Sequence, residues 1–232
     1  MPETRVAFQE ELQTLEDRTL EGLDMVVGAL DRTLEAVQQQ DIELASLVIA
    51  DDDRVDARYL EVHQGILSLL ARQAPVATDL RVVAALLHLI RHMERMGDQC
   101  VNICKLLPLE GHEPPRHAEM LGKIAQMGKQ AHSQVVQARH AFGNRDVELA
   151  EDLPRQDDVI DMLNREVFYL ALDIGDDGEM REWAMHMLLV GRALERIGDI
   201  AVDIGEQTAF VVTGLFREFT DASHPELELR RR

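Results

Sequence analysis

Hydrophobic residues recur along the chain at steps of three and four, the spacing of helices that bury one face. The first such run consists of Leu12, Leu15, Leu23, Val26, Val27, Leu30, Leu34 and Val37. Asp41 follows as a candidate N-cap, and the pattern predicts a second helix from there to about residue 72. A third helix is predicted over about residues 78–107.

The stretch LLPLEGHEPPRH (106–117) carries three prolines and one glycine without apolar periodicity, which indicates a link between two halves. Helices are then predicted over about 116–142, 147–174 and 180–219, with a kink at Pro154. The pattern therefore predicts an all-α fold of six helices. We expect one three-helix bundle over residues 1–110, a second over 111–220 and a charged tail over 221–232.

The two halves also match in sequence. DIELASLVIADDDRVD (41–56) aligns with DVELAEDLPRQDDVID (146–161) at an offset of 105, and MERMGDQCVNI (93–103) aligns with LERIGDIAVDI (194–204) at an offset of 101. The change in offset falls in the connection between the second and third helices of each half, where length varies freely. Two matches in the same order predict tandem three-helix bundles related by internal duplication.

The duplication preserves acidic pairs spaced one helical turn apart. The acids are Asp52, Asp56, Glu94 and Asp98 in the first half, and Asp157, Asp161, Glu195 and Asp199 in the second. On a helical wheel, Asp52 and Asp56 fall in the middle of the predicted buried face, and Glu94 and Asp98 fall on the shoulder of theirs. Because clustered carboxylates repel unless a cation intervenes, we predict a metal site in each half, with iron, Mn, Zn or Mg as candidates.

Ion pairing is the alternative explanation for these acids. Four of them are preceded at a distance of three residues by an arginine, namely Arg91, Arg95, Arg192 or Arg196. Gly97 and Gly198 lie near the centre of the apolar arcs of their helices. Because a mid-helix glycine costs about 1 kcal/mol relative to alanine, we expect both to serve a close approach between helices.

Charge and composition narrow the classes of partner. The formal charge of −19 and pI near 4.8 argue against a nucleic-acid groove, which needs clustered cations. No apolar run approaches the ~20 residues that span a bilayer, and the polar N-terminal segment is unlike a signal peptide. We therefore expect a cytoplasmic protein that binds no nucleic acid and does not insert into a membrane.

The repeated segments, together with PVATDLRVVAALLHLIRHMERMGDQCVNI, resemble the PhoU family of phosphate-signalling regulators over essentially the whole chain. The resemblance implies a negative regulator of phosphate uptake and of the phosphate regulon. It also implies an adaptor between the ATPase of the phosphate ABC transporter and the phosphate-sensing histidine kinase, with metal clusters at the eight acids. Asn102 stands where the second half has Asp203, so we expect the two sites to differ in affinity or nuclearity.

The sequence offers no nucleophile–base pair and no phosphate loop, so we predict no enzymatic activity and no catalytic residue. Two other classes stay open. A carboxylate-bridged di-metal enzyme of ferritin-like type needs a Glu-x-x-His motif, which ERMGDQ and ERIGDI lack. The third class is a metal-free helical scaffold. A homodimer also stays open.

Overall fold

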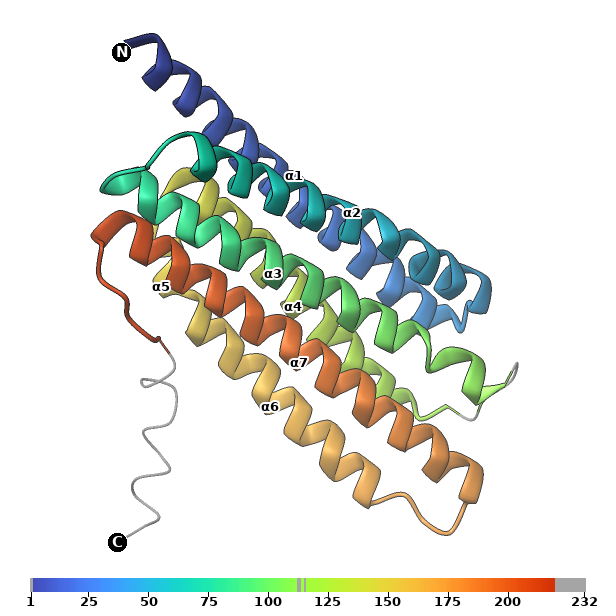
Figure 1. Cartoon of the computed structure of the whole chain (residues 1–232). Helices are drawn as coiled ribbons and strands as arrows, with labels where there is room; N and C mark the ends of the chain where they lie inside the picture. The colour runs from blue at the N-terminus through green and yellow to red at the C-terminus, as the bar shows by residue number, and fades with distance from the viewer. Residues whose placement is uncertain (1, 112–113, 115, 220–232) are drawn as a thin grey trace, which may run out of the picture. The chain divides into compact units, whose positions relative to one another are not determined.

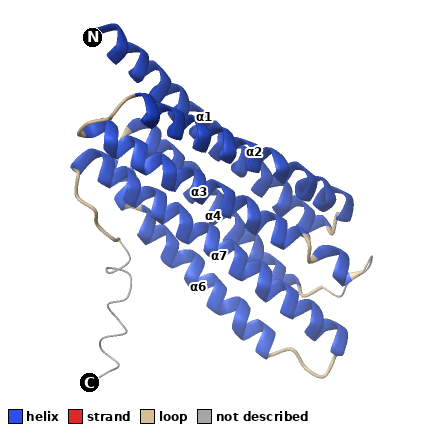
Figure 2. Cartoon of the chain, viewed as in Figure 1, coloured by secondary structure: helices blue, strands red, loops and turns tan. Residues whose placement is uncertain are grey.

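The computed structural model describes residues 2–111, 114 and 116–219 of the chain, and the predicted tail 221–232 lies outside them. The described residues form helices and connecting loops, with no strand among them (Figure 1, Figure 2). The all-α prediction is therefore confirmed. The chain divides into two compact units, residues 1–112 (unit 1) and 113–232 (unit 2).

Unit 1 is a bundle of three long helices. These are α1 (Pro2–Gln39), α2 (Ile42–Arg72) and α3 (Thr78–Cys104), followed by a short 3₁₀ helix, η1 (Leu107–Glu110). Each of the three α-helices packs against both of the others. The buried positions of α2 recur at steps of three, four or seven residues: Ala45, Val48, Val55, Val62, Ile66 and Leu69. The core thus follows the apolar period of the sequence.

Unit 2 repeats this plan with its second helix in two pieces. Its helices are α4 (Ala118–Asn144), α5 (Val147–Glu151), α6 (Leu153–Leu172) and α7 (Gly178–Thr213). The helices α4, α6 and α7 pack against one another, and α5 packs against α4 and α7. Each unit is therefore a three-helix bundle, and the predicted internal duplication is present in the fold.

The turn after the first helix of each unit fixes the register of the repeat. Gln40 and Arg145 both adopt a left-handed backbone with φ of 57°. Each is followed by an aspartate N-cap whose side chain accepts a hydrogen bond from the backbone N–H three residues on, at 2.9 Å for Asp41 and 3.0 Å for Asp146. The two turns lie 105 residues apart. Positions of α1 and α4 therefore correspond at this same offset.

The predicted fifth helix is wrong in one respect. The sequence predicts a single kinked helix over 147–174, whereas the structure separates α5 from α6 at Asp152. Pro154 lies within the first two residues of α6. It has no N–H for the carbonyl of Ala150, and its ring would clash with that carbonyl in a continuous helix. Proline therefore begins a new helix here.

The last predicted helix is too long. The sequence predicts a helix to residue 219, but α7 ends at Thr213. Gly214 takes a left-handed backbone with φ of 74°, and its N–H donates to the carbonyl of Phe210 at 2.8 Å. Glycine adopts this conformation without a steric penalty, so it closes the helix.

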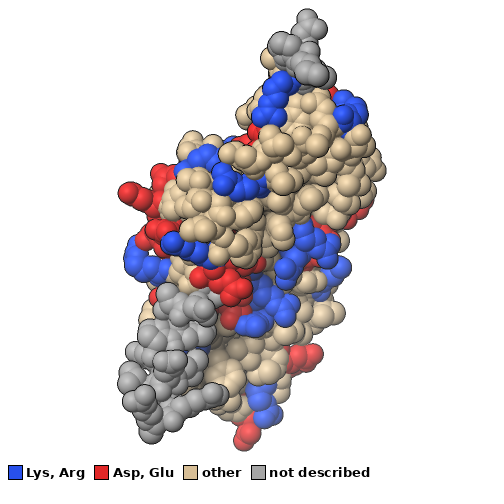
Figure 3. All heavy atoms as spheres, turned by 60° about the vertical axis from the view of Figure 1, so that its left-hand side comes forward, with Lys and Arg blue, Asp and Glu red and all other residues tan. Residues whose placement is uncertain are grey.

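Charged side chains of both signs share the surface. On the face shown in Figure 3, Lys and Arg side chains lie next to Asp and Glu side chains. In unit 1, Arg18 pairs with Glu61 and Arg72 pairs with Glu11, each at 2.6 Å. Such exposed pairs contribute at most about 1 kcal/mol each, so the apolar cores dominate stability. No helix in the described ranges is long and apolar enough to cross a membrane.

Candidate functional site

The eight predicted acids lie on helices that pack against each other, α2 with α3 and α6 with α7. We call Asp52, Asp56, Glu94 and Asp98 the unit-1 cluster, and Asp157, Asp161, Glu195 and Asp199 the unit-2 cluster. In the unit-1 cluster, Asp52 and Glu94 are half-buried, while the other two acids are exposed. In the unit-2 cluster only Asp199 is exposed. The unit-2 cluster is therefore the more enclosed of the two.

The expectation that Asp52 and Asp56 both occupy the middle of the buried face of α2 is wrong. Leu60 and Leu67, which the wheel assigns to that face, are 52% and 53% exposed. Without these two leucines, the centre of the buried face moves toward Val55, which is 3% exposed. Asp52 then lies at the edge of the face and Asp56 lies outside it.

Burial and mutual repulsion raise the pKa of one aspartate in each cluster. Burial raises the pKa of Asp52 to about 6, with repulsion from Asp56 and Asp98 adding to it. Burial likewise raises the pKa of Asp157 to about 7, against the lowering effect of a hydrogen bond from Gln134. The other three acids of the unit-2 cluster also repel Asp157. Because such repulsion weakens with distance, the other acids of each cluster lie near enough to disfavour the charge of Asp52 or Asp157.

Arginine pairs with one glutamate in each cluster, as the alternative explanation requires. Arg91 Nη1 lies 3.3 Å from Glu94 Oε2, and Arg192 pairs in the same way with Glu195. Burial raises the pKa of both glutamates, and the arginines oppose that rise. Ion pairing therefore accounts for one acid of each cluster and leaves the half-buried aspartates Asp52 and Asp157 without such a partner.

The donor chemistry of the clusters suits a hard or borderline cation, since all eight side chains offer carboxylate oxygens. As placed, however, the side chains do not converge: within the described part of the chain, no group of three or more His, Cys, Asp or Glu is positioned to hold a metal ion. Convergence would require Glu94 and Glu195 to leave Arg91 and Arg192. The residues fit a cation by composition and charge, after side-chain rotation.

Gly97 and Gly198 place the half-buried aspartates against the neighbouring helix. A Cβ on Gly97 would lie 2.8 Å from Asp52 Oδ1, and a Cβ on Gly198 would lie 2.5 Å from Asp157 Oδ1. The second position is tighter, because the same Cβ would also meet Gln134 Oε1 and Ile160 Cδ1, each at 2.9 Å. Both glycines thus serve a close approach, and its immediate partner is a carboxylate.

Alanine at these glycines should distinguish the two clusters. We expect Gly198→Ala to lower the free energy of unfolding by about 1–2 kcal/mol, because overpacking of about 1–3 kcal/mol exceeds the gain in helix propensity. Gly97→Ala should cost less, since Asp52 can rotate away. Gly122→Ala is the matched control in α4, because its Cβ would meet nothing within 4 Å. Urea denaturation measures all three, and equal losses for Gly97→Ala and Gly198→Ala would contradict this account.

Gln134 is the site residue that sequence reasoning missed. It is fully buried on α4, and its Nε2 donates to Asp157 Oδ1 at 3.2 Å. Its neighbours Ala131, Val135 and Ala138 are also buried. A glutamine inside that apolar stripe is the signal that was available, because a buried amide needs a polar partner.

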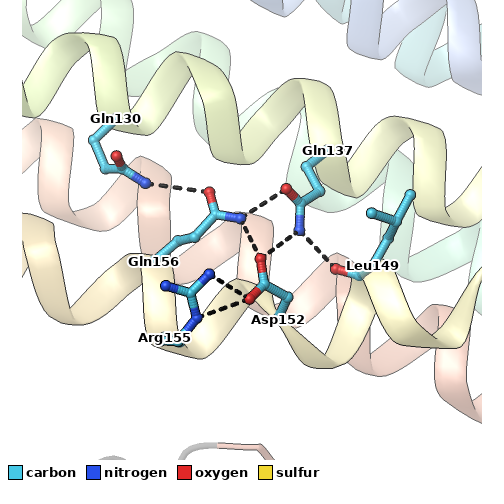
Figure 4. A network of polar contacts seen from close by, with 6 residues as sticks. All are labelled: Gln130, Gln137, Leu149, Asp152, Arg155 and Gln156. Atoms are coloured by element: carbon cyan, nitrogen blue, oxygen red, sulfur yellow. Dashed lines mark hydrogen bonds and ion pairs between the residues drawn. The ribbon is translucent and has the colours of Figure 1, made fainter.

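A second set of glutamines lies beside Gln134. Figure 4 shows this polar network, in which two glutamines of α4 meet the junction of α5 and α6. Gln156 is at its centre: it accepts from Gln130 at 3.2 Å and donates to Gln137 and to Asp152, each at 2.7 Å. Gln137 also donates to the backbone carbonyl of Leu149 at 2.8 Å. The network ties α4 to the break between α5 and α6.

Comparison with known sequences finds one domain twice. The sequence model described as the PhoU domain matches residues 20–107 and again residues 124–208. The first match contains the whole unit-1 cluster, and the second contains the whole unit-2 cluster and Gln134. The repeat seen in the fold therefore corresponds to two copies of this domain.

Relatives and solved structures match over most of the chain. "Phosphate-specific transport system accessory protein PhoU homolog 1" of Mycobacterium leprae is 30% identical over 220 residues, covering 92% of this chain and 96% of the relative. The protein of that name from Mycobacterium bovis is 32% identical over 217 residues, covering 91% and 95%. The crystal structure of the phosphate transport system regulatory protein PhoU from Streptococcus pneumoniae has a TM-score of 0.83 at 26% identity, covering 90% and 99%. PhoU from Pseudomonas aeruginosa has a TM-score of 0.81 at 25% identity, covering 90% and 100%.

Proposed function

This chain belongs to the PhoU family, and on that premise we propose that it is a cytoplasmic negative regulator of phosphate uptake and of the phosphate regulon. In this role it binds the ATPase of the phosphate ABC transporter and the phosphate-sensing histidine kinase as an adaptor, without catalysing a reaction. The observation that carries the proposal is the PhoU domain match in each unit. Relatives named as accessory proteins of phosphate-specific transport support it.

Metal binding is the second part of the proposal. Each cluster would hold a divalent ion or a multinuclear group of iron, Mn, Zn or Mg through its four carboxylates. The raised pKa values of Asp52 and Asp157 support it, because burial and, after it, repulsion from the neighbouring acids disfavour their charge, and a bound cation would offset both. When bound, the metal would supply positive charge that links α2 to α3 and α6 to α7. The surface for partners would then depend on metal.

A di-metal enzyme of ferritin-like type has no specific support. In such enzymes a histidine follows the helical glutamate by three residues. Here Gly97 and Gly198 stand three residues after Glu94 and Glu195. Both glycines instead lie directly against an aspartate of the neighbouring helix. The regulatory role is therefore the better account of these motifs.

Deletion of the gene tests the regulatory role directly. Without the protein, phosphate-starvation genes should be expressed at high phosphate, and a plasmid copy should restore repression. Transcript levels measure the effect, and purified kinase and transporter ATPase tested for binding identify the partners. Repression that persists in the deletion strain at high phosphate would contradict the proposal.

Charge-matched variants test whether the clusters matter for regulation. Asp98→Asn with Asp199→Asn removes one exposed acid from each cluster and should fail to restore repression. Glu43→Gln with Glu148→Gln removes the same charge at exposed, repeat-related positions in the first turns of α2 and α5. This control should restore repression fully. If both double variants restore repression, the protein acts as a metal-free scaffold.

A further inference from the structure

Unit 1 contains a cavity of about 430 Å³ between α1, α2 and α3. Apolar walls come from Met25 and Ala29 of α1, Val48 of α2 and Val101 of α3. Two half-buried acids, Asp51 and Asp52, also line it, together with Arg32 and Arg54, and Arg32 pairs with Asp51 at 2.5 Å. Small-molecule sites in proteins generally have a volume of roughly 300–1,000 Å³, mostly apolar walls and a few polar groups. The cavity of unit 1 has these properties.

Comparison of the two repeats shows which side chains occupy the corresponding space in unit 2. At the offset of 105 set by the matched turns, Ala29 corresponds to Gln134. Three further positions at or near the cavity, Met25, Arg32 and Asp51, correspond to Gln130, Gln137 and Gln156, which form the network of Figure 4. Where unit 2 has four glutamine side chains, unit 1 therefore has a methyl group, a thioether and an ion pair.

Asp52 and Asp157, which correspond in the repeat, consequently have different surroundings. Asp157 accepts a hydrogen bond from the amide Nε2 of Gln134 at 3.2 Å. The methyl group of Ala29 cannot donate such a bond to Asp52. An apolar void beside a half-buried carboxylate costs van der Waals contacts, and it leaves water as the hydrogen-bond donor to the acid. The fold can place a larger side chain here, as Gln134 shows, so Ala29 leaves room in unit 1 that a glutamine takes in unit 2.

We propose that the unit-1 cavity binds a small primary amine with a compact apolar body. The ammonium group donates to Asp52 from the place that the Gln134 amide takes beside Asp157, and the hydrocarbon body packs against Met25, Val48 and Val101. A charged donor is favoured over a neutral one, because its partner is a carboxylate and the other three acids of the unit-1 cluster lie on the same pair of packed helices. Of the two arginines that line the cavity, Arg32 pairs with Asp51, and Arg54 is exposed, so water screens its charge.

Pentylammonium is a suitable probe, and 1-pentanol is its neutral control of similar shape. Titration into the full chain, kept in chelator at about pH 8 so that the amine (pKa near that of Lys, about 10) stays charged, is followed by the NMR signal of the Met25 methyl group. We expect a saturable shift with one amine per chain and at least tenfold weaker binding of pentanol. Equal binding of the two would rule out Asp52 as the partner of the charge.

Two substitutions copy unit 2 and locate the site. Ala29→Gln should abolish the shift, and a melting temperature at or above that of the parent shows that the variant is folded. Gly28→Ser introduces the residue found at position 133. Gly28 lines the cavity and its Cβ would meet nothing within 4 Å, so the serine should take up part of the cavity and weaken binding while the fold is kept. Undiminished binding in both variants would place the amine elsewhere and overturn the proposal.

The reverse substitution in unit 2 completes the experiment. Gln134→Ala removes the amide that donates to Asp157 and should create a second site, raising the stoichiometry by calorimetry from one amine per chain to two. In Ala29→Gln with Gln134→Ala, the single remaining site should be in unit 2. No saturable binding of pentylammonium to the parent up to its solubility limit, or a stoichiometry unchanged by Gln134→Ala, would overturn the proposal.

Discussion

Asp157→Asn should raise the free energy of unfolding of the metal-free protein by about 1–3 kcal/mol at about pH 8. The reason is the pKa of Asp157, which rises from its usual 3.8 to about 7 in the fold, mainly through burial. The full shift would be worth more, but Asp157 is only half-buried and water screens part of it. Asparagine keeps the oxygen that accepts from Gln134 and removes the charge.

The sign of the pH dependence follows from proton binding. Between about pH 4 and pH 7 the folded state holds a proton on Asp157 that the unfolded state has lost. Stability of the parent protein should therefore fall as pH rises through this window and then level off. The Asp157→Asn variant should lack the part of this fall that comes from Asp157, so the difference between the two grows from near zero at about pH 4 to its full value above pH 7.

Urea denaturation in chelator across this pH range measures the difference. Asp52→Asn should show the same behaviour with a smaller gain, because the pKa of Asp52 is raised only to about 6. Asp158→Asn, at the exposed neighbouring position, is the matched control and should change stability by less than about 0.5 kcal/mol. Asp157→Asn could also prove less stable than the parent at every pH. In that case hydrogen bonds would stabilise the carboxylate by more than burial and repulsion destabilise it.

The fold was predictable where one strong local signal decided it. Apolar residues at helical spacing, with Asp41 and Asp146 as N-caps, predict the helices and their duplication. Three helix extents were missed. The third helix ends at Cys104 and not at about residue 107, and the other two misses each depended on a single residue. Pro154 separates α5 from α6 instead of kinking one helix, and Gly214 ends α7 although apolar residues still recur after it, at positions 215, 216 and 219. Competition between continuing and capping a helix is decided by backbone geometry that a periodicity does not contain.

The site was predictable only in its residue types. The duplicated acids lie on helices that pack together, as predicted, but the wheel placed Asp56 inside because it counted Leu60 and Leu67 as core. Soluble proteins expose many single leucines, so an apolar residue does not by itself define a buried face. Gln134 was missed for the opposite reason, because a polar residue in a helix does not by itself indicate burial. Its burial beside Asp157 depends on which helix faces α6, and that is a tertiary property.

Metal should stabilise the protein, and chelation should reverse the effect. A ligand that binds only the folded state adds about 2.7 kcal/mol at a hundredfold excess over its dissociation constant, for each occupied site. We expect Mn²⁺ added to chelator-treated protein to raise the melting temperature, and Asp98→Asn with Asp199→Asn to abolish the rise. The control Glu43→Gln with Glu148→Gln should keep it. Elemental analysis of protein purified without chelator identifies which of iron, Mn, Zn and Mg is bound.

The arginines distinguish metal binding from ion pairing. If the clusters bind metal, Arg91 and Arg192 compete with it for Glu94 and Glu195, so replacing both arginines by alanine should tighten Mn²⁺ binding. If ion pairing alone holds the acids, the same double variant should lose up to about 1 kcal/mol of stability and respond to no metal. A titration of each variant with Mn²⁺, followed by thermal unfolding, separates these outcomes.

Asp157→Asn gives the strictest test, because its effect should change sign with metal. In chelator the variant gains stability, since an unfavourable charge is gone. With Mn²⁺ in excess the parent gains the binding energy of a full set of carboxylates, whereas the variant has lost one ligand and should now be the less stable of the two. Metal binding should also release protons at about pH 6–7, as Asp52 and Asp157 ionise. An Asp157→Asn variant that is more stable than the parent with and without metal would show that the unit-2 cluster binds no cation.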